Sequence, residues 1–503
     1  MTNDQNKNSI TVKSKEKREP LEFKTLVKVD ANQNNEIEKV LSVSAFCKVN
    51  KREDFDNEEL INGSTTLFLC CQTAENDFFE LKKEVEWQQK INSIESVNLL
   101  IEPKVVECQI MNVNTDNITI NVLHNIFIDE IFDEEIGVTF QDEPGFEKDV
   151  ETHDLTKIVA NVNYNALISE EWETNIEEQT TIISRNVDSI IEKSYAGVDN
   201  VTIEGKLFVT LLISENNEIK TVKNVIDFKK EIECINATPG NIVTANVLVT
   251  DCSAGVRKND NGNMTVVIDA EIGGFVVVYT EDSIEVVKDC FSAINDTNVN
   301  IESVNYNFVN NVKYENVNMD LSVTLDEKDD NKEIILVESN NVTLVDVSFV
   351  ENECEVEGVI HLSVLFSNND NRMEKYEKDV PFKTTVAQME GLNRVQDAKF
   401  YVDNFKLKHS QEIELDGRLF LSLYNVENSQ ICYVSNVEFS TEERKDDVAI
   451  KVYMVGKGET LFDIAKNLGV TVSNLIAQNP DLESGVVEGE KVFAYMPLVV
   501  DFQ

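Results

Sequence analysis

The chain has 503 residues, of which 92 are acidic and 45 basic, so its formal net charge is −47. At roughly 100–200 residues per domain this length predicts several domains, and the 42% of hydrophobic residues suffice for packed cores. So acidic a chain repels nucleic-acid phosphates and anionic lipid, which argues against nucleic-acid binding and membrane-surface binding.

The N-terminal residues 1–20 are polar, have no hydrophobic period, and predict a flexible tail. They lack the apolar segment of a secretory signal, and the longest apolar run, Gly273–Tyr279, has the length of a strand rather than of a membrane span. Nine cysteines without regular spacing fit a reducing compartment better than a disulfide framework. We therefore expect a protein that is made and kept in a cytoplasm.

From Leu21 to about Phe439 the dominant pattern is an alternation of apolar and polar residues with a period of two. Residues 201–213 (VTIEGKLFVTLLI) and 354–367 (CEVEGVIHLSVLFS) are the clearest examples. Alternation of this length is typical of half-buried strands. The pattern predicts a mainly β, multidomain fold.

A glycine on the apolar face of a strand, followed by a large aromatic residue, occurs three times. The aromatic residue comes 23 or 24 residues later, and the pairs are Gly63 and Trp87, Gly205 and Phe228, and Gly358 and Phe382. Glycine inside a strand is tolerated where a bulge or the close approach of another group needs the space, so we expect one shared kink per copy. The repeat predicts three related β-rich, sandwich-like units of about 140–150 residues, at 21–148, 149–297 and 298–440.

A weaker repeat of the same strand pattern predicts two related β-halves within each unit. Gly417 is followed by Phe439 after 22 residues, and residues 266–280 occupy the corresponding late position in the second unit. The first unit shows its second half least clearly, around 117–129. Between strands of the second unit, Asn261-Gly262 predicts a type I′ hairpin turn.

The composition and the hydrophobic period change near the C-terminus, where residues 452–497 predict strand, helix, helix and strand. Thr460 and Asp463 form a capping box for the first helix, and Thr471 or Ser473 caps the second.

This C-terminal segment resembles a LysM domain. The motif words are YMVGKGETLFDIA at 453–465, GVTVSNL at 469–475, NPDL at 479–482 and GEKV at 489–492. The resemblance implies a small βααβ domain over 451–498, after a linker over 441–450. LysM domains commonly bind N-acetylglucosamine polymers such as peptidoglycan.

The LysM resemblance also implies a ligand site in two loops, where backbone groups grip the N-acetyl group. Carried over by position, the site residues are Gly458, Glu459, Thr460, Leu461 and Phe462 in the first loop and Ile476, Asn479, Pro480, Asp481 and Leu482 in the second. Glu459 replaces the usual Asp, and Phe462 stands where Trp or Tyr is frequent. Phe462 can still stack on a sugar, without a polar edge. Both a glycan and a protein partner are compatible with these loops.

The three β-rich units resemble the SPOCS-type domain of spore-coat proteins, through the glycine-containing strand and the later triplets at 226–228 (IDF) and 380–382 (VPF). Unit 1 departs from this pattern with Asn62-Gly63 and Trp87. Tandem units that end in one LysM domain resemble the SipL-like group of clostridial coat morphogenetic proteins. That resemblance implies work in the mother-cell cytoplasm at the forespore surface, ending in the spore coat or envelope, with a SpoIVA-like coat ATPase and other coat proteins as partners.

No motif predicts catalysis, a metal site or a cofactor. The four histidines, His124, His153, His361 and His409, form no zinc-binding pattern, and neither a Walker A motif nor a G-x-S-x-G motif is present. His361 lies on the polar face of its strand and is interpreted as a solvated residue rather than a base.

These features together predict a non-enzymatic structural or morphogenetic scaffold of the bacterial spore envelope, in coat or exosporium assembly. The LysM domain would dock it to a morphogenetic protein, and the β units would mediate assembly, including self-association through strand edges. The alternative is an envelope anchor that binds peptidoglycan through the LysM domain.

Overall fold

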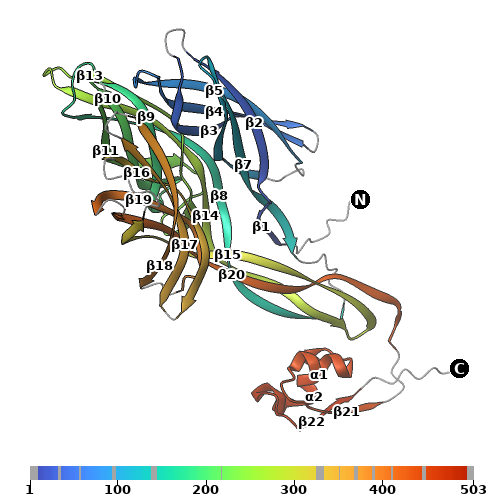
Figure 1. The fold of residues 1–503 in the computed structure, drawn as a ribbon. Helices are drawn as coiled ribbons and strands as arrows, with labels where there is room; N and C mark the ends of the chain where they lie inside the picture. The colour runs from blue at the N-terminus through green and yellow to red at the C-terminus, as the bar shows by residue number, and fades with distance from the viewer. Residues whose placement is uncertain are drawn as a thin grey trace.

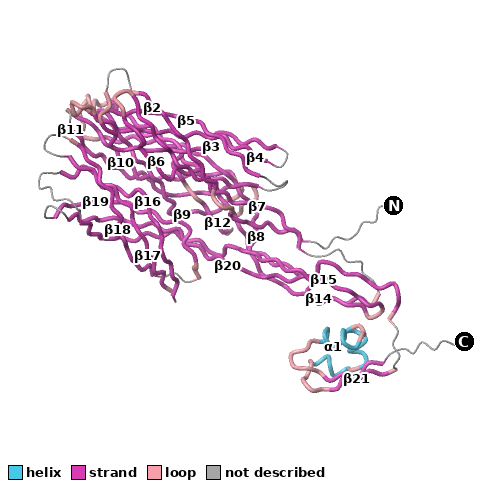
Figure 2. Tube along the Cα trace, turned by 45° about the vertical axis from the view of Figure 1, so that its right-hand side comes forward, coloured by secondary structure: helices cyan, strands magenta, loops and turns pink. Residues whose placement is uncertain are grey.

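The computed structural model describes residues 10–31, 36–55, 58–92, 98–136, 144–216, 218–324, 333–350, 352–367, 372–387, 391–408, 412–444 and 449–495. Figures 1 and 2 show three parts: a head of packed sheets, a stalk of long paired strands that leaves it, and a small helical domain at the far end of the stalk.

Strands make up nearly all of the head. Unit 1 contains β2 (Leu21–Asp30), β3 (Lys39–Phe55), β4 (Glu58–Gln72), β5 (Phe78–Asn92), β6 (Asn98–Val113) and β7 (Asn117–Ile136). Unit 2 contains β8 (Phe146–Glu173), β9 (Thr181–Ala196), β10 (Asn200–Glu215), β11 (Glu218–Glu233), β12 (Ile242–Ala245), β13 (Leu248–Lys258) and β14 (Met264–Ser292). Unit 3 contains β15 (Asn295–Thr324), β16 (Glu333–Val350), β17 (Glu353–Ser367), β18 (Met373–Ala387), β19 (Arg394–Lys408) and β20 (Glu412–Glu443).

The order of strand pairing is the same in all three units. The middle of each unit is an antiparallel meander, β3-β4-β5, β9-β10-β11 or β16-β17-β18. The last strand of each unit, β7, β14 or β20, pairs with the first and the fifth long strand to give a second sheet. The predicted mainly β fold with three related units is confirmed, while the exact boundaries at 148, 297 and 440 stay predictions.

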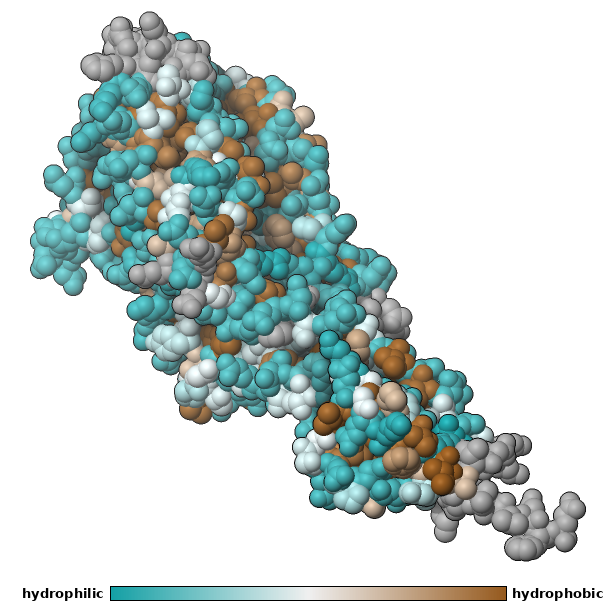
Figure 3. Space-filling view, turned by 90° about the horizontal axis from the view of Figure 1, so that it is seen from below, coloured by the Kyte–Doolittle hydropathy of each residue, from teal (hydrophilic) through white to brown (hydrophobic). Residues whose placement is uncertain are grey.

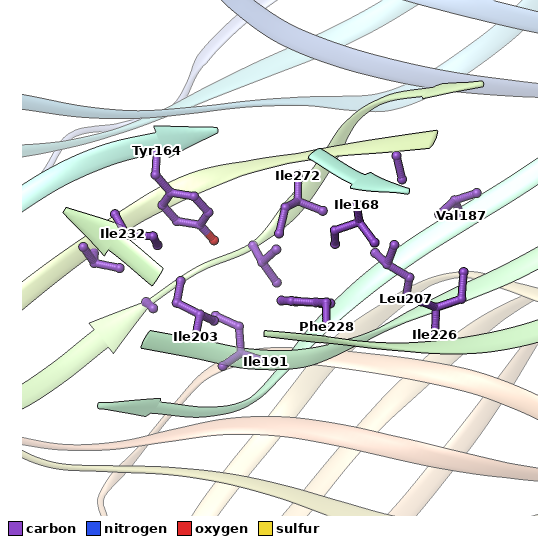
Figure 4. Packing of buried hydrophobic residues seen from close by; sticks show 14 of the residues in the cluster. Tyr164, Ile168, Val187, Ile191, Ile203, Leu207, Ile226, Phe228, Ile232 and Ile272 are labelled. Carbon is purple, nitrogen blue, oxygen red and sulfur yellow. The ribbon is translucent and has the colours of Figure 1, made fainter. Parts of the chain in front are cut away.

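The two sheets of each unit face each other across a hydrophobic core, as in a β-sandwich. In unit 2, Ile203 and Phe228 from the meander lie opposite Tyr164, Ile168 and Ile272 from the second sheet (Figure 4). Comparable clusters fill the other two units. The period-2 alternation of the sequence therefore corresponds to one face of each strand being turned toward this core.

The repeated glycines are the sites of the expected kinks. Gly63, Gly205 and Gly358 each lie opposite an irregularity of register in the preceding strand, and opposite the predicted aromatic residue in the following strand. A Cβ atom on Gly205 would lie 2.0 Å from the carbonyl oxygen of Ile190 and 2.7 Å from Cζ of Phe228. Both reasons for a strand glycine, a bulge and a close approach, apply at once.

Gly417 uses the same arrangement with an aromatic residue other than the predicted one. A Cβ atom there would lie 2.3 Å from Cζ of Phe400, on the neighbouring β19. The pairing with Phe439 was wrong because β20 is a single strand from Glu412 to Glu443. Phe439 lies far along that strand, where its ring centroid is 5.4 Å from that of Phe146.

The hairpin predicted at Asn261-Gly262 connects β13 to β14, but its turn is not type I′. Gly262 has a φ of 83°, whereas Asn261 is not among the residues with positive φ, and both central residues of a type I′ turn require it. The Asn259 side chain accepts hydrogen bonds from the backbone N–H groups of Asn261 and Asn263, at 3.0 and 2.9 Å, which stabilises a wider loop.

The three meanders meet in one apolar cluster at equivalent positions of the repeat. Its members lie 22 residues before or seven residues after the glycine of each unit, and they are Leu41, Ile183, Leu336, Cys70, Leu212 and Leu365, joined by Met373. Cys71, the next residue after Cys70, lies in the core of unit 1, so these two side chains point to opposite faces of β4. The cluster packs the units into one head.

The stalk consists of three two-stranded arms, one from each unit. The paired segments are 10–17 with 129–136, 146–157 with 280–292, and 295–309 with 426–443. All three arms contribute to one hydrophobic cluster. Its central residue is Tyr306, whose hydroxyl lies 3.1 Å from the carbonyl oxygen of Lys13 in the first arm and 3.0 Å from that of Thr156 in the second.

The first arm corrects the predicted N-terminal tail. Ile10–Lys17 form strand β1, whereas residues 1–9 lie outside the described residues. Val12 is buried in the stalk, and Lys15 forms an ion pair of 2.8 Å with Asp129. The strand depends on these contacts with distant residues, which the local polar sequence does not indicate.

Candidate functional site

The domain at the end of the stalk, called the tip here, has the predicted βααβ order. It comprises β21 (Ile450–Met454), α1 (Leu461–Leu468), α2 (Val472–Gln478), a 3-10 helix (Pro480–Ser484) and β22 (Lys491–Tyr495). The two strands pair antiparallel, and both helices pack on one face of them around a common cluster.

The predicted helix caps position the two candidate loops. The Thr460 hydroxyl accepts from the backbone N–H of Asp463, and the Asp463 carboxylate accepts from that of Thr460, which completes the capping box. Gly469 ends α1 with a φ of 74°. Thr471, rather than Ser473, caps α2.

In the first candidate loop, polar groups are satisfied within the tip. The Glu459 carboxylate accepts hydrogen bonds from the backbone N–H of Gly456, at 2.7 Å, and from the Tyr453 hydroxyl, at 2.5 Å. The bond to Glu459 raises the pKa of Tyr453. Glu459 therefore shapes the loop, and its longer side chain, in place of the usual Asp, reaches both donors.

In the second candidate loop, the polar side chains hold the edge of β22. The Asn479 amide accepts from the backbone N–H of Phe493 at 3.0 Å and donates to its carbonyl oxygen at 2.7 Å. Gln478 makes the same pair of contacts with Tyr495. These two amides take the place of a neighbouring strand, so Asn479 has a structural role.

The structure joins the two candidate loops through Phe462 and Leu482, which are buried in one cluster. Leu461 and Ile476 are half-buried, and Gly458, Pro480 and Asp481 are exposed. The expectation that Phe462 can stack on a sugar is wrong for this arrangement, because its side chain is only 8% exposed.

Phe462 is buried because the tip packs on the second arm of the stalk. Its ring meets that of Phe291 edge-on, with 5.2 Å between the centroids. Lys466 pairs with Asp289, and the Glu147 carboxylate accepts from the backbone N–H of Val472. The stalk thus contacts α1 at both Phe462 and Lys466, and α2 at its first residue.

The opposite face of the tip carries an exposed apolar surface, called the sheet face here. It consists of five side chains that are 39–63% exposed, namely Ile450, Val452 and Met454 of β21 and Phe493 and Tyr495 of β22. Ile450 lies opposite Tyr495, and Val452 opposite Phe493, so the side chains are contiguous. Figure 3 shows brown surface on this narrow end of the molecule.

The sheet face escaped the sequence analysis, although the sequence contains a signal for it. Residues 450–454 (IKVYM) and 491–495 (KVFAY) are apolar on both strand faces, or nearly so. When helices cover one face of a two-stranded sheet, the residues on its other face contact water and are usually polar. Apolar residues on that second face therefore indicate that a partner covers them.

His361 makes more specific contacts than those of a solvated residue. It lies between Thr343 Oγ1, 2.9 Å from Nε2, and Asp379 Oδ1, 2.7 Å from Nδ1, across three neighbouring strands. This order resembles a hydrolase triad, but Thr343 and Asp379 are exposed. The arrangement is explained as cross-strand pairing on the outer face of the sheet.

Among the residues that the structure describes, no three His, Cys, Asp or Glu side chains are grouped in a way that could hold a metal ion. Neither helix of the described chain has the length and apolar character needed to cross a membrane.

Comparison with models of protein families matches residues 180–257 to "SipL, SPOCS domain" and residues 453–488 to "LysM domain". The chain contains a SPOCS domain and a LysM domain. No curated protein and no solved structure matches the chain. The SPOCS match spans β9 to β13, including Gly205 and Phe228, and the LysM match spans the helical tip, so the LysM resemblance and the SPOCS resemblance of unit 2 are confirmed. The SPOCS resemblance of units 1 and 3 stays a prediction. Both domain families are non-catalytic.

Proposed function

We propose that this protein is a non-enzymatic scaffold of the bacterial spore envelope, made in the mother cell and acting at the forespore surface. Its LysM domain docks to a protein partner, a SpoIVA-like coat ATPase, and its three β units contact other coat proteins. The SPOCS and LysM domains support the sporulation setting and a capacity for peptidoglycan binding.

The observation that carries the protein-docking role is the exposed sheet face of the LysM domain. Five large apolar side chains side by side in water are unfavourable by about 25 cal/mol for each Å² of apolar area, and such patches commonly mark protein interfaces. Sugars instead favour polar loops with exposed aromatic rings, and here Phe462 is covered by Phe291.

The stalk supports the same role because it places the LysM domain away from the head. Its second arm pairs residues 280–292 with 146–157, a length of roughly 40 Å at about 3.3 Å per residue. A partner can therefore reach the sheet face without contacting the sandwiches (Figure 1).

The experiment compares two double variants of the full chain. Val452→Ser with Phe493→Ser makes a cross-strand pair of the sheet face polar, and Pro480→Ala with Asp481→Asn alters the exposed candidate loop. Binding to the purified coat ATPase is measured by biolayer interferometry, and binding to peptidoglycan by cosedimentation. We expect the sheet-face variant to lose about tenfold or more in ATPase affinity, about 1.4 kcal/mol, and the loop variant to retain it.

The second candidate function, a peptidoglycan anchor, is favoured by the LysM match and by the exposure of Gly458, Pro480 and Asp481. It would be supported if the loop variant failed to cosediment while the sheet-face variant behaved as wild type in both assays. That result would refute docking through the sheet face.

The assembly of the β units should depend on salt if carboxylate repulsion controls it. With a formal net charge of −47, polymerisation is expected to increase with ionic strength. Light scattering over a salt series measures this, and assembly that ignores salt would show that charge repulsion does not limit it.

A further inference from the structure

A cavity of about 590 Å³ lies where the three units meet at the base of the stalk. It is lined by β1, by β6 and β7 of unit 1, by β9, β12, β13 and β14 of unit 2, and by β15, β19 and β20 of unit 3. No part of the LysM domain lines it. A site here would have no counterpart within a single unit, because each unit supplies only part of the wall.

The charge of the lining is opposite to that of the chain. The chain has 92 acidic and 45 basic residues, whereas four acidic and six basic residues line the cavity. The basic residues are Lys15, Lys17, Arg18, Lys104, Arg394 and Lys399. In so acidic a protein, this concentration of cations is a specific feature of the cavity.

Three of the cations have carboxylate partners: Lys15 pairs with Asp129, Arg18 with Glu130, and Lys399 with Asp188. Within the part of the chain that the structure describes, Lys17, Lys104 and Arg394 form no ion pair. Three positive charges thus remain for an additional anion.

Lys17 is exposed, like Lys104 and Arg394, but its environment disfavours its charge. Desolvation by the surrounding protein is the largest cause that lowers its pKa, and the neighbouring Arg394 and Lys15 lower it further, against the opposing effect of Asp129. Arg394, from unit 3, also opposes the charge of Lys15, from the first arm. An anion between these cations would reverse the repulsion.

Two tyrosine hydroxyls complete the polar lining. Tyr279 is 3% exposed and Tyr424 is 9% exposed, both line the cavity, and neither hydroxyl makes a hydrogen bond to another described residue. Burial raises the pKa of Tyr424 well above its usual value, so its hydroxyl keeps its proton and can donate.

The rest of the wall is apolar and limits the charge of a ligand. Phe275 and Leu248 of unit 2 face the cavity with Phe420 of unit 3. Glu102 and Asp397 also line it, and Asn246 donates a hydrogen bond to Glu102. These carboxylates repel a polyanion, so the lining suits a molecule with one or two negative charges and an apolar body.

We propose that this cavity binds a small organic anion, an aromatic or apolar body that carries carboxylate or phosphate groups. Lys17, Lys104 and Arg394 contact the anionic groups, and Tyr279 and Tyr424 donate hydrogen bonds to them. The volume lies in the range of small-molecule sites, about 300–1,000 Å³. Because all three units line the site, the ligand ties them together and stabilises the head.

The test uses the full chain and two probes with the same aromatic body, isophthalate and phenyl phosphate. Each is titrated to millimolar concentration by calorimetry, and the melting temperature is followed at matched ionic strength with sodium chloride as the reference. We expect saturable binding of at least one probe, with one site per chain and a rise in melting temperature beyond that of the salt. The stronger probe shows whether carboxylate or phosphate is the recognised group.

A matched pair of variants locates the binding. Lys17→Gln with Arg394→Gln should weaken it at least about tenfold, whereas Lys24→Gln with Lys83→Gln removes the same charge from equally exposed positions outside the cavity and should leave it unchanged. Without probe, the cavity variant should melt at the same temperature as wild type or higher, because it relieves repulsion. No saturable binding of either probe, or an equal loss in both variants, would overturn the proposal.

Discussion

The head and the stalk are built from the same long strands, yet they are held together in different ways. In the head, the strands form three- and four-stranded sheets that cover each other in pairs, so each unit has its own core. In the stalk the strands continue as pairs, and a single cluster collects apolar side chains from all three arms.

The difference shows what a threefold repeat can and cannot supply. A duplicated unit brings its own sandwich core, so the head requires only that each copy fold. The stalk forms only when the three arms are adjacent, because no two-stranded arm can bury its apolar face alone. The position of the LysM domain therefore depends on the assembly of the units.

The largest effect is expected from filling the space over a repeated glycine in the head. In Gly205→Val, the new side chain would meet the carbonyl oxygen of Ile190 and the ring of Phe228, at 2.0 and 2.7 Å from its Cβ. We expect a loss of about 4 kcal/mol or more in unfolding free energy, measured by urea denaturation.

Gly255→Val is the matched control, since Gly255 also lies in a strand of unit 2 but has no heavy atom within 4 Å of its Cβ position. This variant should change the unfolding free energy by less than about 0.5 kcal/mol. Equal losses at both positions would mean that strand glycines matter here for backbone reasons rather than for the ring above them.

The features that were predictable from the sequence are those with short-range causes. Glycine in an alternating strand is unfavourable without a reason, so Gly63, Gly205 and Gly358 revealed the repeat. In the tip, Thr460 and Asp463 cap α1 through contacts three residues apart. Neither required knowledge of the rest of the chain.

The features that escaped prediction depend on residues far apart in sequence. Strand β1 forms because Val12 packs against residues from the arms of the other units. The sequence around Val12 is polar, so by itself it resembles a flexible tail. The position of Phe462 in the LysM motif predicts that it can stack on a ligand. In the structure its ring instead packs against that of Phe291, which lies 171 residues earlier in the sequence. The lining of the central cavity likewise comes from all three units.

The second prediction concerns a substitution at the central residue of the stalk, Tyr306. Tyr306→Ala deletes a ring that is 2% exposed and joins three arms, and should lower the local stability of the stalk by about 3 kcal/mol. Hydrogen exchange followed by mass spectrometry should show faster exchange in 10–17 and 280–292, with the head protected as before.

Tyr306→Phe separates the hydrogen bond from the packing and should lose only about 1 kcal/mol. If Tyr306→Ala accelerated exchange in β10 and β17 as much as in the arms, head and stalk would be one cooperative unit, and the contrast between them would not hold.

The third prediction is that acid destabilises the head through one buried histidine. His124 is 1% exposed, stacks on Phe23, and bonds to the Thr65 hydroxyl at 2.9 Å. Burial is the main cause that lowers the pKa of His124 from 6.5 to about 4. As the pH falls below 6.5 the unfolded chain takes up this proton first, so the folded state loses stability.

Between pH 6.5 and about pH 5, the loss should be about 2 kcal/mol, at about 1.4 kcal/mol for each pH unit. His124→Phe, which keeps a ring against Phe23, should remove that part of the pH dependence in urea denaturation at several pH values. An unchanged slope in the variant would assign the acid sensitivity to carboxylates elsewhere.

The smallest effect is expected where the LysM domain meets the stalk through charge. The side chains of Lys466 and Asp289 are 40% and 26% exposed, and ion pairs so open to solvent contribute about 0.5 kcal/mol. Lys466→Gln should therefore raise amide exchange in α1 only about twofold, and a double-mutant cycle with Asp289→Asn should give a coupling energy of the same size. The burial of Phe462 against Phe291 then supplies most of the docking, and high salt should leave the tip in place. A coupling energy above about 2 kcal/mol would instead make the contact mainly electrostatic, and salt would then release the LysM domain and expose Phe462.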